Sequence, residues 1–506
     1  MTKLSNAFLA AFCSRILAAG LGLVVLPIYY RLLGANDFGV ISFFLSLQVM
    51  VCFLDLGLGA TLIRKLSQNQ KENPYLAKNY AKTFEALYLI LAIAVALILM
   101  SVSGWLATHW IQATSDQLPS LPNQLRIATV TICMVWFSSI YTAMLVGQEQ
   151  QFKLAVSQAV LAVLRFAVPL GAVTWSQDLT VFFVAYLLVA VLQLVLMRWV
   201  AVGQLPQTVK RAVVDFTLLR SDAGFSIGML GIFLTTFLIT QTDKIILSKR
   251  LSIADFGLYT LCLTLAGGIY LAVQPLFNVL LPRFTRLIEG GEESELRHLY
   301  HLAAQLMALM VIPISMLIVA FPREILFVWT AQPSIVEQGA WILRLLVLAN
   351  VINAIMNLPY ALQLGSGWTS LPLNANYLSV AGLFPTMIWA VSEWGALGGA
   401  AVTLLLQLVI LCIVPYATHA KLLCDEKWHW YKYGVIFPSL GCGLLMWIAS
   451  HLWSSGHHRG YDIIVLVMVL VLGIFISLSC TLELRRFVWT LILRRFNTSY
   501  LKGKYG

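Results

Sequence analysis

Residues 7–30 read AFLAAFCSRILAAGLGLVVLPIYY, an apolar run whose single charged residue is Arg15. A helix needs about 20 apolar residues to cross the hydrocarbon core of a bilayer, so this run can span a membrane. It is longer than the apolar segment of a signal peptide, and it lacks a small-residue cleavage site. We therefore predict an uncleaved transmembrane helix here.

Comparable apolar runs recur along the whole chain and set the expected fold. They lie at 38–63, 83–106, 126–146, 154–174, 180–201, 224–247, 257–281, 300–321, 340–364, 368–389, 395–416, 433–452 and 461–482. Of all residues, 60% are hydrophobic and only 11% are charged, whereas about a quarter of the residues in a soluble domain are charged. The sequence thus predicts an all-α polytopic membrane protein with about 14 transmembrane helices.

The basic residues indicate how these helices are oriented. Most of the 33 Lys and Arg residues fall in alternate loops on one side of the predicted membrane. Cytoplasmic loops carry an excess of Lys and Arg, so we predict that this side, with both termini, is cytoplasmic. The net charge of +11 then reflects loop topology and does not indicate a nucleic-acid partner.

The remaining composition does not predict an enzyme. The eight cysteines form no CxxC pair and fall mostly in apolar runs, which is typical of small apolar side chains rather than of metal or disulfide sites. The chain contains no GxxxxGK[ST] loop for a nucleotide. We expect a secondary transporter without catalytic residues, metal or cofactor, driven by an ion gradient, the membrane potential or substrate supply.

A duplicated motif divides the chain into two similar parts. Residues 31–39 read RLLGANDFG, and residues 249–257 read KRLSIADFG. When the numbering is shifted by the distance between these two motifs, the third to fifth predicted spans align with the ninth to eleventh, in the same topology. Parallel repeats of this kind are a transporter architecture, with the substrate path between the halves. We predict two six-helix lobes in parallel repeat at 1–201 and 224–420, a basic cytoplasmic linker at 202–223, and two additional helices with a basic cytoplasmic tail at 421–506.

Several short motifs resemble those of a known family. They are SRIL at 14–17, YRLLG at 30–34, DLGLG at 55–59, TDKIILS at 242–248 and DFGLY at 255–259. In these segments the chain resembles the polysaccharide transporters, the O-antigen or repeat-unit flippase branch of the multidrug/oligosaccharidyl-lipid/polysaccharide exporter superfamily.

The resemblance implies a function as well as a fold. It implies a flippase that moves undecaprenyl-diphosphate-linked oligosaccharide from the cytoplasmic to the periplasmic leaflet of the bacterial inner membrane, by alternating access between the lobes. The cargo would serve the biosynthesis of O-antigen, capsule or exopolysaccharide. The implied partners are the lipid bilayer, the lipid-linked oligosaccharide, a polysaccharide polymerase and a chain-length regulator.

Charged residues inside the predicted spans are candidate sites, because each Arg or Lys costs roughly 2.5–3.5 kcal/mol at a helix centre. Arg15 and Asp55 both lie about 12 Å from the cytoplasmic ends of their spans, at a rise of about 1.5 Å per residue. They form either a structural ion pair or a switch in which Arg15 contacts diphosphate in one state and Asp55 in the other. Arg165 lies near the middle of a span that offers it no acid, which favours an aqueous cavity or an anionic ligand.

Further charges lie toward the outer ends of the spans. Asp243 and Lys244 lie in the outer third of the seventh span, and adjacent helix residues point in different directions, so we do not expect them to need each other. Asp243 is either a protonation or cation site or a member of a structural pair, and Lys244 can snorkel outward. Arg126 and Arg344 end repeat-equivalent helices, where interface anchoring competes with ligand binding.

A polar stripe completes the predicted site. The tenth span carries Asn350, Asn353, Asn357 and Tyr360 on one helical face, and the eighth span carries Tyr270, Gln274 and Asn278. Unpaired amides in lipid are costly, so these faces should meet water, sugar or another helix. The predicted substrate-binding residues are Arg15, Arg31, Arg165, Lys244, Gln274, Asn278, Arg344, Asn350, Asn353, Asn357 and Tyr360, and the predicted ion-coupling residues are Asp55 and Asp243.

Two other functions fit the sequence less well. A drug or cation antiporter on the same fold would need an acidic cavity, whereas the clearest charge at the middle of the membrane is Arg165. A membrane-embedded glycan polymerase or ligase usually has a large periplasmic loop, and the outer loops here are short.

Overall fold

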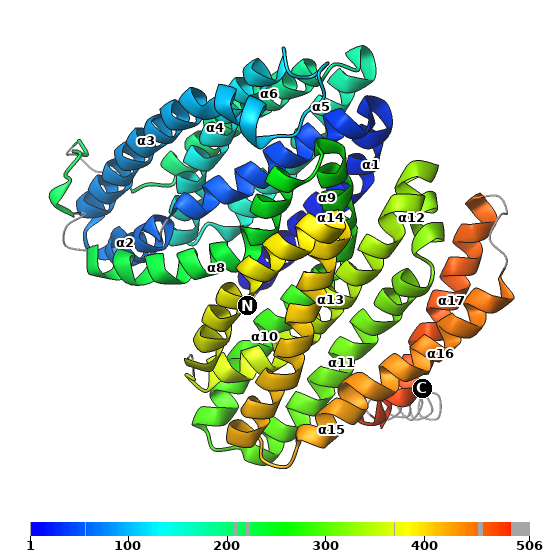
Figure 1. The fold of residues 1–506 in the computed structure, drawn as a ribbon. Coiled ribbons are helices and arrows are strands. Elements are labelled where there is room, and N and C mark those ends of the chain that lie inside the picture. Colours follow the sequence, from blue (N-terminus) through cyan, green and yellow to red (C-terminus); the bar gives the residue numbers. More distant parts are fainter. Residues whose placement is uncertain are drawn as a thin grey trace, which may run out of the picture. The chain divides into compact units, whose positions relative to one another are not determined.

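The computed structural model of the chain is helical, with short connections between the helices (Figure 1). It describes residues 2–55, 57–206, 211–218, 223–368, 370–453 and 459–486. Parts of the predicted linker (207–210 and 219–222) and of the predicted basic tail (487–506) lie outside the described residues.

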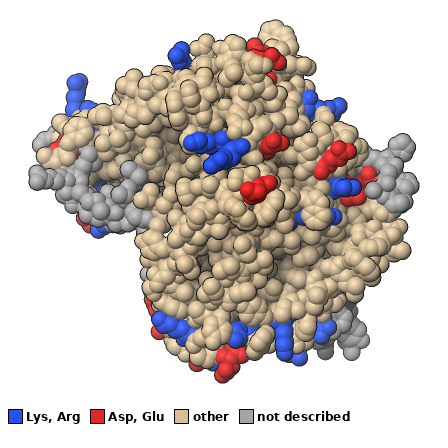
Figure 2. All heavy atoms as spheres, in the orientation of Figure 1, with Lys and Arg blue, Asp and Glu red and all other residues tan. Residues whose placement is uncertain are grey.

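The described helices confirm a multi-pass membrane protein. Ten of them are long and apolar enough to cross a bilayer, or eleven if the bent pair α9 (Ile253–Gly267) and α10 (Tyr270–Glu289) forms one span. Many apolar side chains point outward, such as Leu97 with 63% of its surface exposed and Leu188 with 63%. On the face in Figure 2, charged side chains are sparse and separated by broad uncharged areas. Such a surface suits contact with lipid.

Two of these helices are much longer than one crossing requires. Helix α1 (Thr2–Cys52) has 51 residues and α14 (Ser370–Leu422) has 53. Each contains one glycine with non-helical backbone angles, Gly34 at φ 83° and Gly395 at φ 57°. Residues with a side chain rarely adopt such positive φ angles, so glycine is what allows a break at these two positions. The count of fourteen crossings stays a prediction.

Contacts group the chain into two compact units, the first of which comprises residues 1–261 and 384–396. Within it, α1 packs against α5, and α4 packs against α3 and α6. Its other complete helical elements are η1 (Phe53–Asp55), α2 (Leu58–Glu72), α3 (Pro74–Trp105), η2 (Leu106–Trp110), α4 (Leu121–Gly147), α5 (Gln151–Ser176), α6 (Leu179–Val202) and α8 (Ala223–Arg250).

The second unit comprises residues 262–383 and 397–506. Its helix α13 packs against α10, α11 and α12, while α16 and α17 pack on each other and on α11. A core of Leu317, Phe321, Met446, Leu466 and Val469 joins these last helices to α11. The bounds are α11 (Glu293–Ala320), α12 (Pro322–Thr330), α13 (Pro333–Gly365), α15 (Lys427–Tyr431), η3 (Lys432–Ile436), α16 (Phe437–Leu452) and α17 (Arg459–Cys480). These two units are defined by contacts and not by the sequence repeat, so they do not test the predicted lobes, which stay a prediction.

The structure corrects two of the predicted spans. The run 38–63 is not one helix: α1 ends at Cys52, η1 follows, and α2 begins after Gly57, whose φ of 82° reverses the local backbone. The run 257–281 is divided between α9 and α10, which are bent by 45°. Both errors arise because apolar composition is continuous across a change in backbone direction.

The two copies of the repeated motif meet inside the first unit. A side-chain carbon added to Gly39 would overlap the backbone carbonyl of Ile253, and one added to Gly257 would lie 2.9 Å from the Cα of Gly39. The repeat-equivalent glycines therefore allow two helix beginnings to approach backbone to backbone. Nearby, the amide of Ile253 donates to the carbonyl of Gln112 at 3.2 Å, which ties the same loop to the end of η2.

Candidate functional site

A chain of polar side chains holds Arg165 in the interior of the first unit. An Nη of Arg165 on α5 donates to Oε1 of Gln193 on α6 at 2.6 Å, and Nε2 of Gln193 donates to Oγ of Ser138 on α4 at 2.6 Å. Gln193 and Ser138 are buried, and Arg165 is half-buried. Among the described residues, no carboxylate pairs with this arginine.

This arrangement solvates the arginine without cancelling its charge. A neutral amide oxygen accepts a hydrogen bond, but it brings no negative charge, so a full positive charge remains inside an apolar helix pair. The span of Arg165 offers no acid, its partner here is the amide of Gln193, and its ligand role stays a prediction. Sequence reasoning missed Gln193, although a lone Gln in the apolar run 180–201 was a usable signal.

Asp55 does not pair with Arg15. Its carboxylate instead accepts hydrogen bonds from the Tyr88 hydroxyl on α3 and from the backbone N–H of Gly59 at 3.2 Å. The break at η1 turns Asp55 toward the beginning of α2, where a carboxylate stabilises free N–H groups. Of the two interpretations, the structural ion pair is therefore not formed here, and Arg15 is exposed with no ion pair in the part of the chain that the structure describes. The switch between diphosphate and Asp55 stays a prediction.

Asp243 and Lys244 interact, although their adjacent positions did not require it. Lys244 Nζ lies 3.6 Å from Oδ1 of Asp243 and donates to the carbonyl of Thr240 at 2.9 Å. The Tyr259 hydroxyl donates to Oδ2 of Asp243 at 3.3 Å. The long, flexible Lys244 side chain can reach Asp243 although the two Cβ atoms point apart. The contact agrees with the structural pair that was one of the two interpretations of Asp243, and its role in ion coupling stays a prediction.

Lys244 also borders a small cavity in the first unit. The cavity has a volume of about 260 Å³ and is lined by residues of α1, α3, η2 and α8, including Phe43, Trp105 and Trp110. Its walls are almost entirely apolar apart from Ser46, Ser248 and Lys244. The ammonium is thus compensated by Asp243 at the edge of an apolar space.

Part of the polar stripe of the second unit joins helices. Tyr270 on α10 donates to Oδ1 of Asn353 on α13 at 2.5 Å, and Nδ2 of Asn353 donates to Oε1 of Gln407 on α14 at 3.3 Å. Nδ2 of Asn357 donates to the carbonyl of Asn353 at 2.9 Å. These bonds satisfy the middle of the stripe by helix packing. Gln407, another lone amide in an apolar run, was not predicted.

The other members of the stripe are more open. Tyr360 is 41% exposed and stacks on Phe277 with 6.0 Å between ring centroids. Gln274 and Asn278 are exposed, and neither makes a side-chain hydrogen bond within the described ranges. Exposed amides on membrane helices need water or a polar ligand, so this end of α10 and α13 stays a candidate surface.

The outer arginines differ from each other. Arg344 donates from Nε to the carbonyl of Val319 at 2.9 Å, and its guanidinium lies 4.7 Å from the ring centroid of Trp341. Trp341 is 58% exposed, as is typical of an aromatic anchor at a membrane interface. Arg31 is exposed, and in the described part of the chain it forms no ion pair. The contacts of Arg344 suit anchoring, and its role in binding stays a prediction.

Comparison with known proteins identifies the relatives of this chain. The polysaccharide biosynthesis protein family matches residues 5–288, and the MatE family matches residues 229–389. A Salmonella typhi protein described as a candidate O-antigen transporter is 23% identical over 280 residues, covering 54% of this chain and 63% of that protein. The chain thus matches less than two thirds of the length of this relative.

Two solved structures are similar in fold. The lipid II flippase MurJ, in an inward closed conformation, matches with a TM-score of 0.74 and 12% identity, covering 96% of this chain and 99% of that one. An inward-facing multidrug resistance transporter of the MATE family matches with a TM-score of 0.62 and 15% identity, covering 80% and 94%. At such identities the likeness shows a shared fold and does not define the cargo.

The chain has the multi-pass helical fold of these two structures, and residues 229–389 also match the MatE family. The chain belongs to the polysaccharide biosynthesis protein family, whose match covers more than half of its length. The family resemblance expected from the short sequence motifs is confirmed.

Proposed function

We propose that this protein flips undecaprenyl-diphosphate-linked oligosaccharide from the cytoplasmic to the periplasmic leaflet of the bacterial inner membrane. The observation that carries the proposal is Arg165, a cation inside the membrane-spanning helices that is held by an amide and not by an acid. A diphosphate is the kind of ligand that would use this charge, whereas a cationic drug would be repelled by it. The names of the relatives agree with a saccharide cargo.

The proposed topology has fourteen crossings with both termini in the cytoplasm. At about 1.5 Å per residue, the 51 residues of α1 extend for about 76 Å, more than twice the thickness of a hydrocarbon core of about 30 Å. The predicted number is reached from the ten helices above in three steps. Helices α1 and α14 each count as two crossings because of their glycine breaks, α8 adds one, and the bent pair α9 and α10 adds one. Two six-helix lobes in parallel repeat, with two additional helices, remain the proposed domain organisation.

The membrane potential is a sufficient source of energy for this transport. It contributes about 2.3 kcal/mol per elementary charge and per 100 mV. An inside-negative potential pushes negative charge outward, so the outward movement of a head group with two negative charges is favoured by roughly 4–5 kcal/mol per 100 mV. Export would require no nucleotide. Asp55 and Asp243 stay candidates for coupling to a cation, and a polymerase and a chain-length regulator stay the proposed protein partners.

Deleting the gene tests this function directly. We expect the surface polysaccharide to be lost and the undecaprenyl-linked repeat unit to accumulate in the cytoplasmic leaflet, where it is protected from a periplasmic glycosidase. Expression of the intact chain should restore both readouts. Normal surface polysaccharide together with altered tolerance of cationic drugs would contradict the proposal and favour an antiporter.

A further inference from the structure

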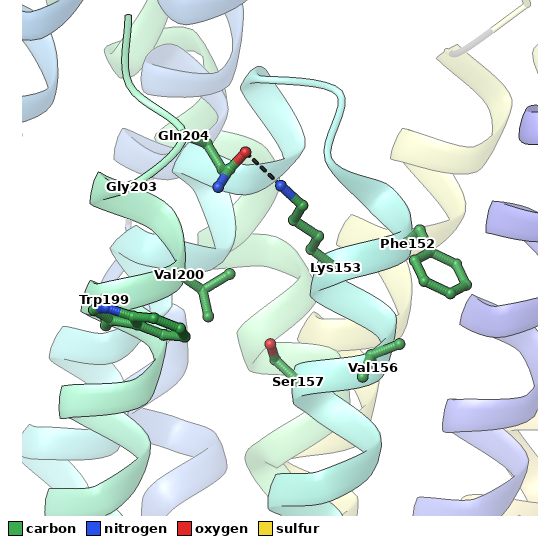
Figure 3. Close-up of a pocket in the computed structure, with 8 residues that line it drawn as sticks. All are labelled: Phe152, Lys153, Val156, Ser157, Trp199, Val200, Gly203 and Gln204. Atoms are coloured by element: carbon green, nitrogen blue, oxygen red, sulfur yellow. Dashed lines mark hydrogen bonds between the residues drawn. The ribbon is translucent and has the colours of Figure 1, made fainter. Parts of the chain in front are cut away.

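A groove on the first unit is separate from the hydrogen-bonded side chains around Arg165. It lies between the beginning of α5 and the end of α6 and has a volume of about 520 Å³ (Figure 3). Lys153, which reaches across it, precedes Arg165 by twelve positions, or about 18 Å along the helix. The mechanism proposed above does not use this groove.

The groove combines one positive charge with mostly apolar walls, to which Ser157 and Gln204 add polar groups. Lys153 Nζ donates to Oε1 of Gln204 at 2.5 Å, and this bond spans the mouth between the two helices (Figure 3). Within the residues that the structure covers, no carboxylate pairs with Lys153. Val156 and Val200 line the walls, and Trp199 is 76% exposed beside them. The charge at the mouth is therefore available to an anion, and the walls are suited to a hydrocarbon chain.

The position of the groove suits the boundary between lipid head groups and tails. In the proposed topology the beginning of α5 and the end of α6 face the cytoplasm. Trp is enriched at membrane interfaces, and anionic lipids of the cytoplasmic leaflet attract basic residues near the surface. The exposed Trp199 and the unneutralised Lys153 are therefore residue types that suit the boundary between head groups and tails.

We propose that this groove binds an anionic phospholipid of the surrounding membrane, with its phosphate on Lys153 and one acyl chain along Val156, Val200 and Trp199. The single cation matches the single negative charge of a phosphatidylglycerol head group. A diphosphate-linked oligosaccharide carries two negative charges and a bulky glycan, for which the lining of the groove offers no second cation and, besides Ser157 and Gln204, no polar side chain. Free phosphate would leave the apolar walls unused.

The test compares lipid retention by the purified full-length protein. Native mass spectrometry would count the phosphatidylglycerol and phosphatidylethanolamine molecules that stay bound after each lipid is added to the detergent-solubilised protein. We expect the wild type to prefer phosphatidylglycerol and Lys153→Gln, which keeps an amide beside Gln204, to lose about fivefold in that preference, since one basic residue near a membrane surface contributes on the order of 1 kcal/mol. Lys421→Gln is the matched control, because Lys421 lies 4.0 Å from the Trp368 ring centroid and does not line the groove.

A second variant and a competition experiment distinguish a bound phospholipid from other ligands of the groove. Val200→Phe fills the groove while leaving Lys153 in place, and we expect it to reduce retention of phosphatidylglycerol without changing the melting temperature. Equal retention of both lipids by the wild type, or an unchanged preference in Lys153→Gln, would overturn the proposal. Displacement of the bound lipid by inorganic phosphate alone would show a simple anion site and would also overturn it.

Discussion

Arg165 and Lys244 are both cations within apolar helices of the first unit, and the protein holds them in opposite ways. Arg165 donates to an amide, Gln193, whereas Lys244 lies beside a carboxylate, Asp243. An amide satisfies the hydrogen-bond geometry of a cation and leaves its charge in place, while a carboxylate cancels the charge. We therefore expect the cation whose partner is neutral, and not the compensated one, to be the ligand site.

The largest effect is expected from removing the uncompensated charge. Arg165→Ala should lower the rate of flipping at least about tenfold, because a hydrogen bond to a charged group contributes about 1.5–3 kcal/mol and more is lost where a diphosphate depends on it. The measurement is transport of lipid-linked oligosaccharide in proteoliposomes with a set membrane potential. Arg126→Ala removes the same charge from an exposed arginine that donates to Oδ1 of Asn123 at 3.2 Å, and it should leave transport unchanged. Full transport by Arg165→Ala, at normal protein levels, would remove Arg165 from the site.

A smaller effect is expected from giving Arg165 a carboxylate partner, as Lys244 has. Gln193→Glu places a carboxylate where Arg165 now meets an amide, so the arginine becomes an ion pair and competes less well for diphosphate. We expect transport to fall about fivefold while thermal stability stays about the same, since the attraction within a buried ion pair is largely offset by the cost of removing the new carboxylate from water. Gln204→Glu makes the same change beside Lys153 and should not affect transport. Equal transport by Gln193→Glu and the wild type would show that the neutrality of the partner is unimportant.

The smallest effect is expected at the compensated cation. Lys244→Gln removes the cation beside Asp243 and keeps the bond from Tyr259 to that carboxylate. Because both side chains are partly exposed, we expect a loss of about 1 kcal/mol in stability and about a twofold loss in transport. The double variant Asp243→Asn with Lys244→Gln removes both charges and should recover both losses. Thermal unfolding in detergent and the same transport assay give the two readouts. A complete loss of transport at unchanged stability would instead make Lys244 a ligand contact.

The repeat shows how far sequence alone could reach into the structure. The matching motifs at 31–39 and 249–257 predicted a duplication, and the glycines of the two motifs do lie against each other. No pattern in the sequence indicated that contact, because the alignment of two segments does not state where they meet. The polar stripe behaves similarly: its position on one face of α13 was predictable, but its bond to Gln407 on α14 was not.

For the candidate site, the sequence indicated the charged residues but not their partners. Arg165 could be chosen because a lone arginine in an apolar span is costly wherever its neighbours lie. Its partner Gln193 could not be chosen with the same certainty, since pairing depends on how α5 and α6 are rotated about their axes. Asp55 was predictable as an intramembrane acid, but the turn at η1 gives it Tyr88 as a partner instead of Arg15.

The sequence by itself determined the membrane class, the transporter family and the identity of the charged residues, because hydropathy and motif residues are properties of single positions. The tertiary structure alone decided where the helices break, as at Gly34, Gly57 and Gly395, and which side chains neutralise which charges. The physical reason is that the free energy of a charge in the membrane depends on the few atoms within hydrogen-bond distance. Those atoms come from helices far apart in the chain.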